Sequence, residues 1–130
     1  MRMPQLLESV RGGTGQMIVF RVEHNRHRLR GLQVHVCESR AECSRGLLLR
    51  RRPAQDSAWL LPGRRAAHTI GLHYPIDVLF CDAGGQILRI ERALRPCRIV
   101  RERRARQVWQ LCAGAAEHWG WSVGDRIRPC

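Results

Sequence analysis

The segment over residues 76–90 constrains the fold of this chain more than any other stretch. It reads I-D-V-L-F-C-D-A-G-G-Q-I-L-R-I, which is an apolar run of strand length, a glycine-rich turn and a second apolar run. A three-residue loop of Ala83, Gly84 and Gly85, with Gly85 in the left-handed region, closes two such runs into an antiparallel hairpin. The sequence therefore predicts a β-hairpin at the centre of the domain.

The length of that loop decides which side chains of the hairpin share a face, because side chains alternate along a strand. A carboxylate within the apolar run must be paired or lie on a solvated face. The loop predicts a core face made of Ile76, Val78, Phe80, Leu88 and Ile90. It places Asp77 on the opposite face with Leu79, Ile87, Arg89 and Glu91.

Further strand and helix signals recur along the chain. Short apolar runs predict strands at residues 17–22, 32–37, 58–61, 67–72, 98–100 and 107–112 and near Ile127. The run at 32–37 alternates between apolar and polar residues, and His35 is expected to meet solvent on its polar face. The capping box S-R-A-E at residues 39–42 predicts one short helix, and residues 113–119 before Gly120 predict a second.

Short strands in this number, together with two short helices, predict a mainly β fold. We expect a compact single-domain β sandwich or barrel-like sheet, and 130 residues suffice for one modest core. The weakly patterned start ends in R-G-G-T-G. Residues 1–15 are therefore expected to form a disordered tail, residues 16–130 a single β domain, and residues 24–30 a polar basic turn within it.

Basicity is the most extreme property of the composition. The net charge is +12 and all 23 basic residues are arginine, which also indicates a GC-rich coding bias. The arginines fall into groups, and each group is either a solvated surface or a face that binds anions, including nucleic acid. Few aromatic residues interleave with them, and no zinc finger, RNP or KH-type signature accompanies them. The groups are Arg26, Arg28 and Arg30; Arg50, Arg51 and Arg52; Arg64 and Arg65; and Arg101, Arg103, Arg104 and Arg106.

Cysteine usage and hydropathy set the expected compartment. The six cysteines include no C-x-x-C pair, so neither a zinc site nor a disulfide framework is indicated. The N-terminus lacks the apolar stretch of a signal peptide, and no run reaches the roughly eighteen apolar residues of a membrane span. We therefore expect a cytoplasmic protein without a membrane span, a metal or a cofactor.

Several short blocks follow one another in a recognisable order. Together these blocks resemble the family catalogued as domain of unknown function 192 over residues 32–127. The resemblance implies a compact, mainly β fold with short helices, in bacterial and archaeal proteins whose biochemical role is not established. The blocks are Ser39-Arg40 with Arg45-Gly46-Leu47-Leu48 and Arg50; Leu60-Leu61-Pro62 with His68-Thr69 and Pro75-Ile76-Asp77; Asp82, Gly85 and Ile87; and Ala113-Gly114 with Gly124-Asp125.

The chain departs from the family pattern at two places. The strand before Ala113 carries Gln110 where the family usually has a glutamate. The segment A-H-T-I-G-L stands where a common branch of the family has W-M-K-N-T. A role resting on that acid or that lysine does not transfer to this chain.

Five residues are candidates for a ligand site: Arg45, His68, Thr69, His73 and Asp77. Asp77 either forms an ion pair with Arg89 or Arg45, or lines a small polar pocket with His68 and Thr69. His68 and His73 are five residues apart and would point to opposite faces of a straight strand, which favours structural histidines over a metal site. No nucleophile motif accompanies them, so no catalytic residue is assigned.

Three functions remain open on the sequence alone. The first is a non-enzymatic binding or accessory domain for a polar or anionic ligand or a protein partner, using the surface around His68, Thr69 and Asp77. The second is an uncharacterised enzyme with Asp77 and His68 as an acid–base pair. The third is electrostatic binding of nucleic acid through the arginine groups.

Overall fold

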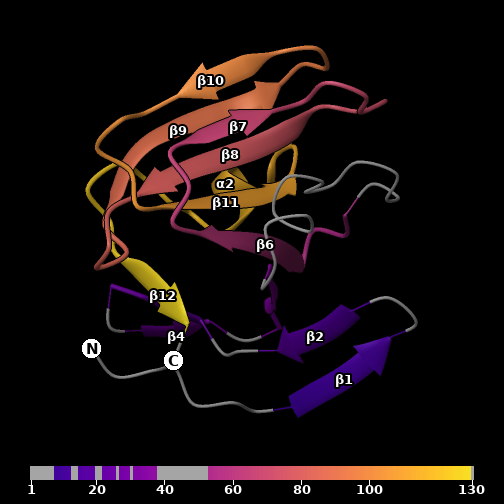
Figure 1. The fold of residues 1–130 in the computed structure, drawn as a ribbon. Coiled ribbons are helices and arrows are strands. Elements are labelled where there is room, and N and C mark those ends of the chain that lie inside the picture. The colour runs from indigo at the N-terminus through magenta and orange to yellow at the C-terminus, as the bar shows by residue number, and fades with distance from the viewer. Residues whose placement is uncertain are drawn as a thin grey trace.

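A central five-stranded sheet organises the molecule (Figure 1). The computed structural model describes residues 8–12, 15–19, 22–25, 27–29, 31–37 and 53–129. Strands β5 (Gln33–Val36) and β6 (Ser57–Pro62) run parallel to each other, and the other neighbouring strands of the sheet are antiparallel. The predicted mainly β, sandwich-like fold is confirmed. The strand order is β5 (Gln33–Val36), β6 (Ser57–Pro62), β11 (Gln107–Cys112), β8 (Ile76–Cys81) and β9 (Ile87–Leu94).

Three smaller sheets accompany the central one. Strands β3 (Val22–His24) and β4 (His27–Leu29) form a hairpin whose turn includes Asn25, with a φ of 49°. The basic turn predicted at residues 24–30 is therefore too long, because residues 27–29 form a strand. Strand β1 (Glu8–Gly12) pairs with β2 (Gly15–Val19), although the sequence predicted disorder over residues 1–15. The start of the β domain at residue 16 stays a prediction. The sheets are β1 (Glu8–Gly12) with β2 (Gly15–Val19); β7 (Ala66–His68) with β10 (Ile99–Arg101); and β12 (Ile127–Pro129) with β3 (Val22–His24) and β4 (His27–Leu29).

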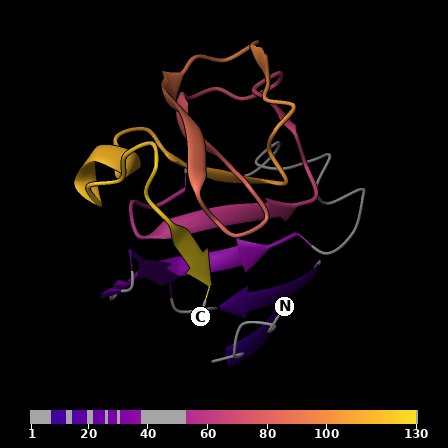
Figure 2. The same cartoon turned by 90° about the vertical axis from the view of Figure 1, so that its left-hand side faces the viewer.

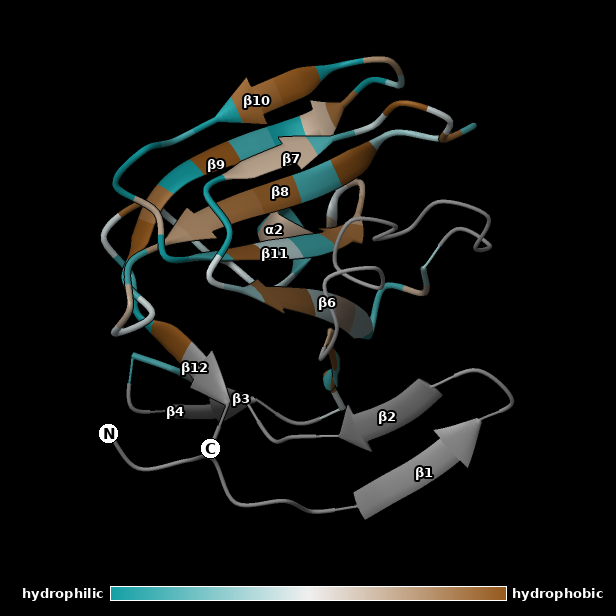
Figure 3. Ribbon diagram, viewed as in Figure 1, coloured by the Kyte–Doolittle hydropathy of each residue, from teal (hydrophilic) through white to brown (hydrophobic). Residues whose placement is uncertain are grey.

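Both faces of the central sheet are buried, which explains why β8 is an almost continuous apolar run. All six residues of β8 are buried, and Figure 3 shows hydrophobic residues along most of the strand. The face toward β7 and β10 contributes to a ribbon-side core of Cys37, Leu61, Ala67, Leu72, Tyr74, Ile76, Val78, Phe80, Ala105 and Val108. The other face contributes to a helix-side core that includes Val34, Leu79, Cys81, Ile87, Trp109, Ala115, Ala116, Trp121 and Ile127.

The predicted hairpin is confirmed, but its predicted core face is wrong in part. The amide of Asp82 donates to the carbonyl of Gln86, and Gly85 between them has a φ of 89°, as a three-residue loop requires. An irregularity then shifts the pairing between Phe80 and Cys81, so that Ile90 lies opposite Leu79. Ile90 consequently packs on the helix-side core, and not with Phe80.

His35 does not meet solvent as the alternation at residues 32–37 predicted. It is buried and stacks on Trp59, with ring centroids 4.8 Å apart. The alternation itself is present, since Val34 lies in the helix-side core and Cys37 in the ribbon-side core. The expectation failed because both faces of this sheet are covered.

The described helix is α2 (Ala115–His118), shorter than the predicted 113–119. Gly120 follows it with a φ of 72°, and its amide donates to the carbonyl of Glu117, which confirms its predicted place at the C-terminal end. The helix predicted from Ser39 lies outside the described residues. Among the residues that the structure describes, no helix combines the length and apolar character needed to cross a membrane.

The end of the domain around β12 (lower left in Figure 1) is tied together by Asp125. Its Oδ2 is 2.8 Å from Nε2 of His24 and accepts the amide of Ser122 at 3.0 Å. Partial burial raises the pKa of this carboxyl, but the hydrogen bonds to His24, Asn25 and the Ser122 amide outweigh that effect and leave the pKa below its ordinary value of 3.8.

This lowered pKa predicts an acid-dependent contribution to stability. A depressed folded-state pKa stabilises the native state above the unfolded pKa, and the contribution is lost as the pH falls through the folded value. We expect Asp125→Asn to lower the free energy of unfolding by about 1–2 kcal/mol at neutral pH. The difference from the wild type should shrink as the pH falls below about 4 in urea denaturation series. A difference that stays constant down to pH about 2 contradicts the assignment.

Candidate functional site

The carboxylate of Asp77 is buried and bonded to backbone amides. Only 1% of the residue is exposed. Its Oδ1 accepts the amide of Ala93 at 2.8 Å. Its Oδ2 accepts the amides of Gly114 at 3.1 Å and Ala116 at 3.0 Å. These donors compensate a buried charge in the way that an arginine or a ligand was expected to do.

These bonds join three parts of the fold. Gly114, the residue that precedes α2, has no side chain with which to cap the helix, and Asp77 supplies the missing acceptor from β8. Opposite Asp77 the pairing with β9 shifts, and Ala93 adopts a φ of 48° in the resulting bulge. Asp77 therefore holds the bulge of β9 and the first turn of α2 against β8.

The predicted ion pair between Asp77 and Arg89 is wrong. Arg89 donates from Nε to Oε1 of Glu91 at 2.7 Å. It lies opposite Phe80, which faces the ribbon-side core, whereas Asp77 is directed to α2 on the other face. Arg45, the other predicted partner and a candidate ligand residue, lies outside the described residues.

Thr69 is fully buried and organises the turn between β9 and β10. Its hydroxyl donates to the carbonyl of Arg95 at 2.6 Å and accepts the amide of Arg98 at 2.9 Å. Its own amide donates to the carbonyl of Arg98 at 2.8 Å. Thr69 thus fixes the backbone from which Arg95 and Arg98 project.

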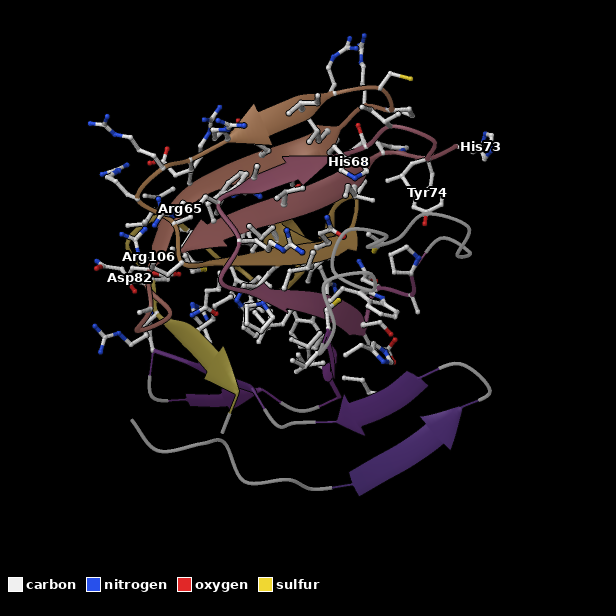
Figure 4. All side chains as sticks on the ribbon, viewed as in Figure 1. Arg65, His68, His73, Tyr74, Asp82 and Arg106 are labelled. Carbon is white, nitrogen blue, oxygen red and sulfur yellow. The ribbon has the colours of Figure 1, made fainter. Side chains whose placement is uncertain are left out.

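The two candidate histidines are exposed and do not join Asp77. His68 belongs to β7, on the ribbon side of the sheet, and pairs with Ile99 of β10. Figure 4 shows His73 projecting from the loop after β7, away from His68. The turned view in Figure 2 places α2 on the side of the sheet away from β7, so Asp77 and His68 are separated by the sheet.

Metal ligands and the buried thiol of Cys81 were the remaining candidates for a site among the described residues. Within the ranges described above, no group of three His, Cys, Asp or Glu side chains is arranged to hold a metal ion. Cys81 is buried, and its burial, with the nearby charge of Asp82, raises the pKa of its thiol strongly. That thiol stays protonated at neutral pH and is not a nucleophile.

The two-stranded ribbon of β7 and β10 carries a strongly basic surface. Arg65, Arg95, Arg98, Arg101 and Arg103 are all exposed along it or at its ends. We call these five arginines, together with Ile99 and His68, the ribbon surface. In Figure 3 the end of β10 and the loop that follows it are coloured as hydrophilic, and they belong to this region. In Figure 1, β10 forms the upper edge of the molecule.

Glu102 is the one acidic residue in the described segments 63–75 and 92–106, which contain the two strands of the ribbon. It accepts Nε of Arg104 at 2.8 Å, and this hydrogen bond holds the pKa of Glu102 below its ordinary value of 4.5. Glu102 therefore stays ionised and compensates Arg104. The sequence indicated the arginine groups, but it did not indicate that the pairing of β7 with β10 brings two of them together with Ile99.

Comparisons with known proteins support the fold and leave the activity open. Residues 20–129 match the profile of the family described as "Uncharacterized ACR, COG1430" (DUF192). A crystal structure from Sinorhizobium meliloti 1021, described as a "putative transcription regulator", is 27% identical, has a TM-score of 0.73 and aligns over 84% of this chain and 90% of its own.

A second solved structure shows the same fold. It is a protein of unknown function from Novosphingobium aromaticivorans DSM 12444, with a TM-score of 0.77 over 93% of this chain and 92% of its own. At 14% identity this likeness concerns the fold alone. The curated proteins gave no match to the chain.

Proposed function

Because this chain belongs to the DUF192 family, whose description assigns no activity, we propose from the arrangement of its own side chains that it is a non-enzymatic module. Its partner in this proposal is the phosphate backbone of nucleic acid, bound through the ribbon surface. The observation that carries the proposal is the concentration of exposed arginine on one ribbon, whose described segments contain a single acidic residue.

The charge distribution supports an anionic partner. Residues 63–75 and 92–106 contain nine arginines and one glutamate, a net charge of +8 with neutral histidines, out of +12 for the whole chain. Arg65, Arg101 and Arg103 lie close in the structure, because the amide of Glu102 donates to the carbonyl of Arg65. Arginine presents a planar fork of donors that matches phosphate oxygens.

The polar pocket around Asp77 receives no such support. The carboxylate of Asp77 and the hydroxyl of Thr69 are both buried and bonded to the backbone. An acid–base pair needs its two groups within reach of one substrate, and the sheet separates Asp77 from His68. The arginines of the ribbon surface, by contrast, project from exposed backbone and meet solvent.

The description of the Sinorhizobium meliloti protein points to the same class of partner. That protein, described as a "putative transcription regulator", is 27% identical to this chain over most of its length, which supports a role that involves nucleic acid. A nucleic-acid partner also fits the cytoplasmic location that the sequence predicts.

The proposal is tested by fluorescence anisotropy with a labelled, mixed-sequence DNA duplex of about 20 base pairs, titrated with the wild-type protein. We expect a Kd in the micromolar range at about 50 mM salt, weakening steeply as salt is raised, because phosphate contacts release condensed counterions. Poly-glutamate of similar net charge is the control for charge without phosphate geometry. No binding to the duplex at about 50 mM salt overturns the proposal.

A further inference from the structure

The pairing of β7 with β10 decides which side chains of the ribbon face outward. Val100 and Ala67 are paired, and both contact the ribbon-side core. The neighbouring pairs, Ile99 with His68 and Arg101 with Ala66, therefore point to the opposite side. Ile99 is 68% exposed, and His68 and Arg101 are exposed as well. An isoleucine and an arginine thus stand side by side on an open two-stranded face.

Both ends of this ribbon are held by backbone hydrogen bonds. At one end the amide of Thr69 donates to the carbonyl of Arg98 at 2.8 Å. At the other end the amide of Glu102 donates to the carbonyl of Arg65, also at 2.8 Å. The flanking arginines, Arg65, Arg95, Arg98 and Arg103, therefore project from a fixed backbone on either side of the outward face. This lowers the entropy cost of binding a partner.

The dimensions and the charge of this face fit one occupant. A strand of three residues spans about 10 Å and neighbouring strands lie about 4.8 Å apart. The major groove of B-form DNA is about 12 Å wide and admits a two-stranded β-ribbon between its two phosphate backbones. Resting on the function proposed above, we propose that β7 and β10 enter the major groove of B-form DNA, with the flanking arginines on the phosphates.

Within the groove each outward side chain has a chemical counterpart. Thymine presents a methyl group in the major groove, which suits the exposed Ile99. Guanine presents two acceptors, O6 and N7, which suit the guanidinium of Arg101. An exposed isoleucine contributes nothing to a contact with phosphate alone, so this residue separates groove binding from backbone binding.

The test compares a duplex that contains thymine with the same duplex in which every thymine is replaced by uracil. Uracil lacks only the methyl group, so the phosphates and the pairing edges are unchanged. We expect the wild type to bind the thymine duplex about fourfold more tightly for each methyl that it contacts. Ile99→Ser should remove that preference while retaining salt-dependent binding. Val123→Ser is the matched control, because Val123 is 61% exposed in the loop before β12.

A second arm tests Arg101 with a duplex carrying 7-deazaguanine, which lacks the N7 acceptor. The wild type should lose at least about fivefold in affinity, and Arg101→Ala should bind both duplexes equally. Double-stranded RNA of the same sequence should bind more weakly, because side chains cannot read its deep, narrow major groove.

Each outcome decides for or against the groove. Equal affinity for thymine and uracil duplexes, or a thymine preference that survives in Ile99→Ser, overturns the inference and leaves backbone binding intact. RNA binding as tight as DNA binding also overturns it. Failure to bind any of these nucleic acids removes the proposed function together with the inference. Circular dichroism of each variant confirms that the exposed substitutions leave the fold unchanged.

Discussion

Replacing Asp77 with alanine is expected to lower the free energy of unfolding by about 3–5 kcal/mol. The substitution removes the acceptor of three backbone amides, those of Ala93, Gly114 and Ala116. The buried N–H of Ala116 left without an acceptor costs about 1–3 kcal/mol, and the part-buried amides of Ala93 and Gly114 add smaller costs that do not add fully. Because small domains have only about 5–15 kcal/mol of stability, Asp77→Ala should lose a large fraction of it.

Urea denaturation followed by tryptophan fluorescence measures this loss. Asp77→Asn keeps the shape and one acceptor oxygen but turns an NH₂ group toward a donor, so it should lose less, about 2–3 kcal/mol. It provides the measurement if the alanine variant does not fold. Asp56→Ala is the control, since Asp56 is exposed, and it should change stability by less than about 0.5 kcal/mol. A loss below about 1 kcal/mol for Asp77→Ala contradicts the role of Asp77 as the link between β8, β9 and α2.

The sequence identified Asp77 as an unusual residue but not what surrounds it. A carboxylate between Ile76 and Val78 must have partners, and this much follows from the cost of burying charge. Its partners are backbone amides from a bulge and a helix end, which a sequence does not display as side chains. A sequence does display arginine side chains, and for that reason it led to the predicted ion pair between Asp77 and Arg89.

Local sequence patterns predicted strands well where an apolar run or a turn glycine determines the backbone conformation. The strand at Gln107–Cys112 has the predicted bounds, the first apolar run of the predicted hairpin forms the strand Ile76–Cys81, and Gly85 closes the hairpin as expected. The partition of side chains between faces was wrong at Ile90, because an irregularity near Phe80 reverses the residues that follow it, until a second irregularity opposite Asp77 restores the alternation. The burial of His35 depends on layers that cover both faces, and these come from distant parts of the chain.

The candidate site changed for the same reason. His68, Thr69 and Asp77 are near in sequence, and the sequence combined them into one pocket. The structure directs Asp77 to α2 and Thr69 to the turn at Arg95, and leaves His68 on the outer ribbon. The ribbon surface depends on contacts between segments about thirty residues apart along the chain, which no local pattern encodes.

Removing three arginines of the ribbon surface is the second change with a large expected effect. We expect Arg65→Ala, Arg101→Ala and Arg103→Ala in one variant to weaken binding of a DNA duplex by roughly tenfold to a hundredfold at about 100 mM salt. All three are exposed, so the free energy of unfolding should change little. Arg126→Ala is the control for loss of an arginine elsewhere, since Arg126 is exposed near β12, away from the ribbon.

The salt dependence of duplex binding is the measurement that tests the central claim most directly. The logarithm of the association constant, plotted against the logarithm of the salt concentration, has a slope of about −0.9 for each phosphate neutralised on B-form DNA. We predict that the triple arginine variant has a slope shallower than that of the wild type by about 1.8, because Arg65 and Arg103 contact phosphates whereas Arg101 contacts guanine, and that Arg126→Ala leaves the slope unchanged. Identical slopes for the wild type and the triple variant would show that the ribbon surface does not contact phosphate.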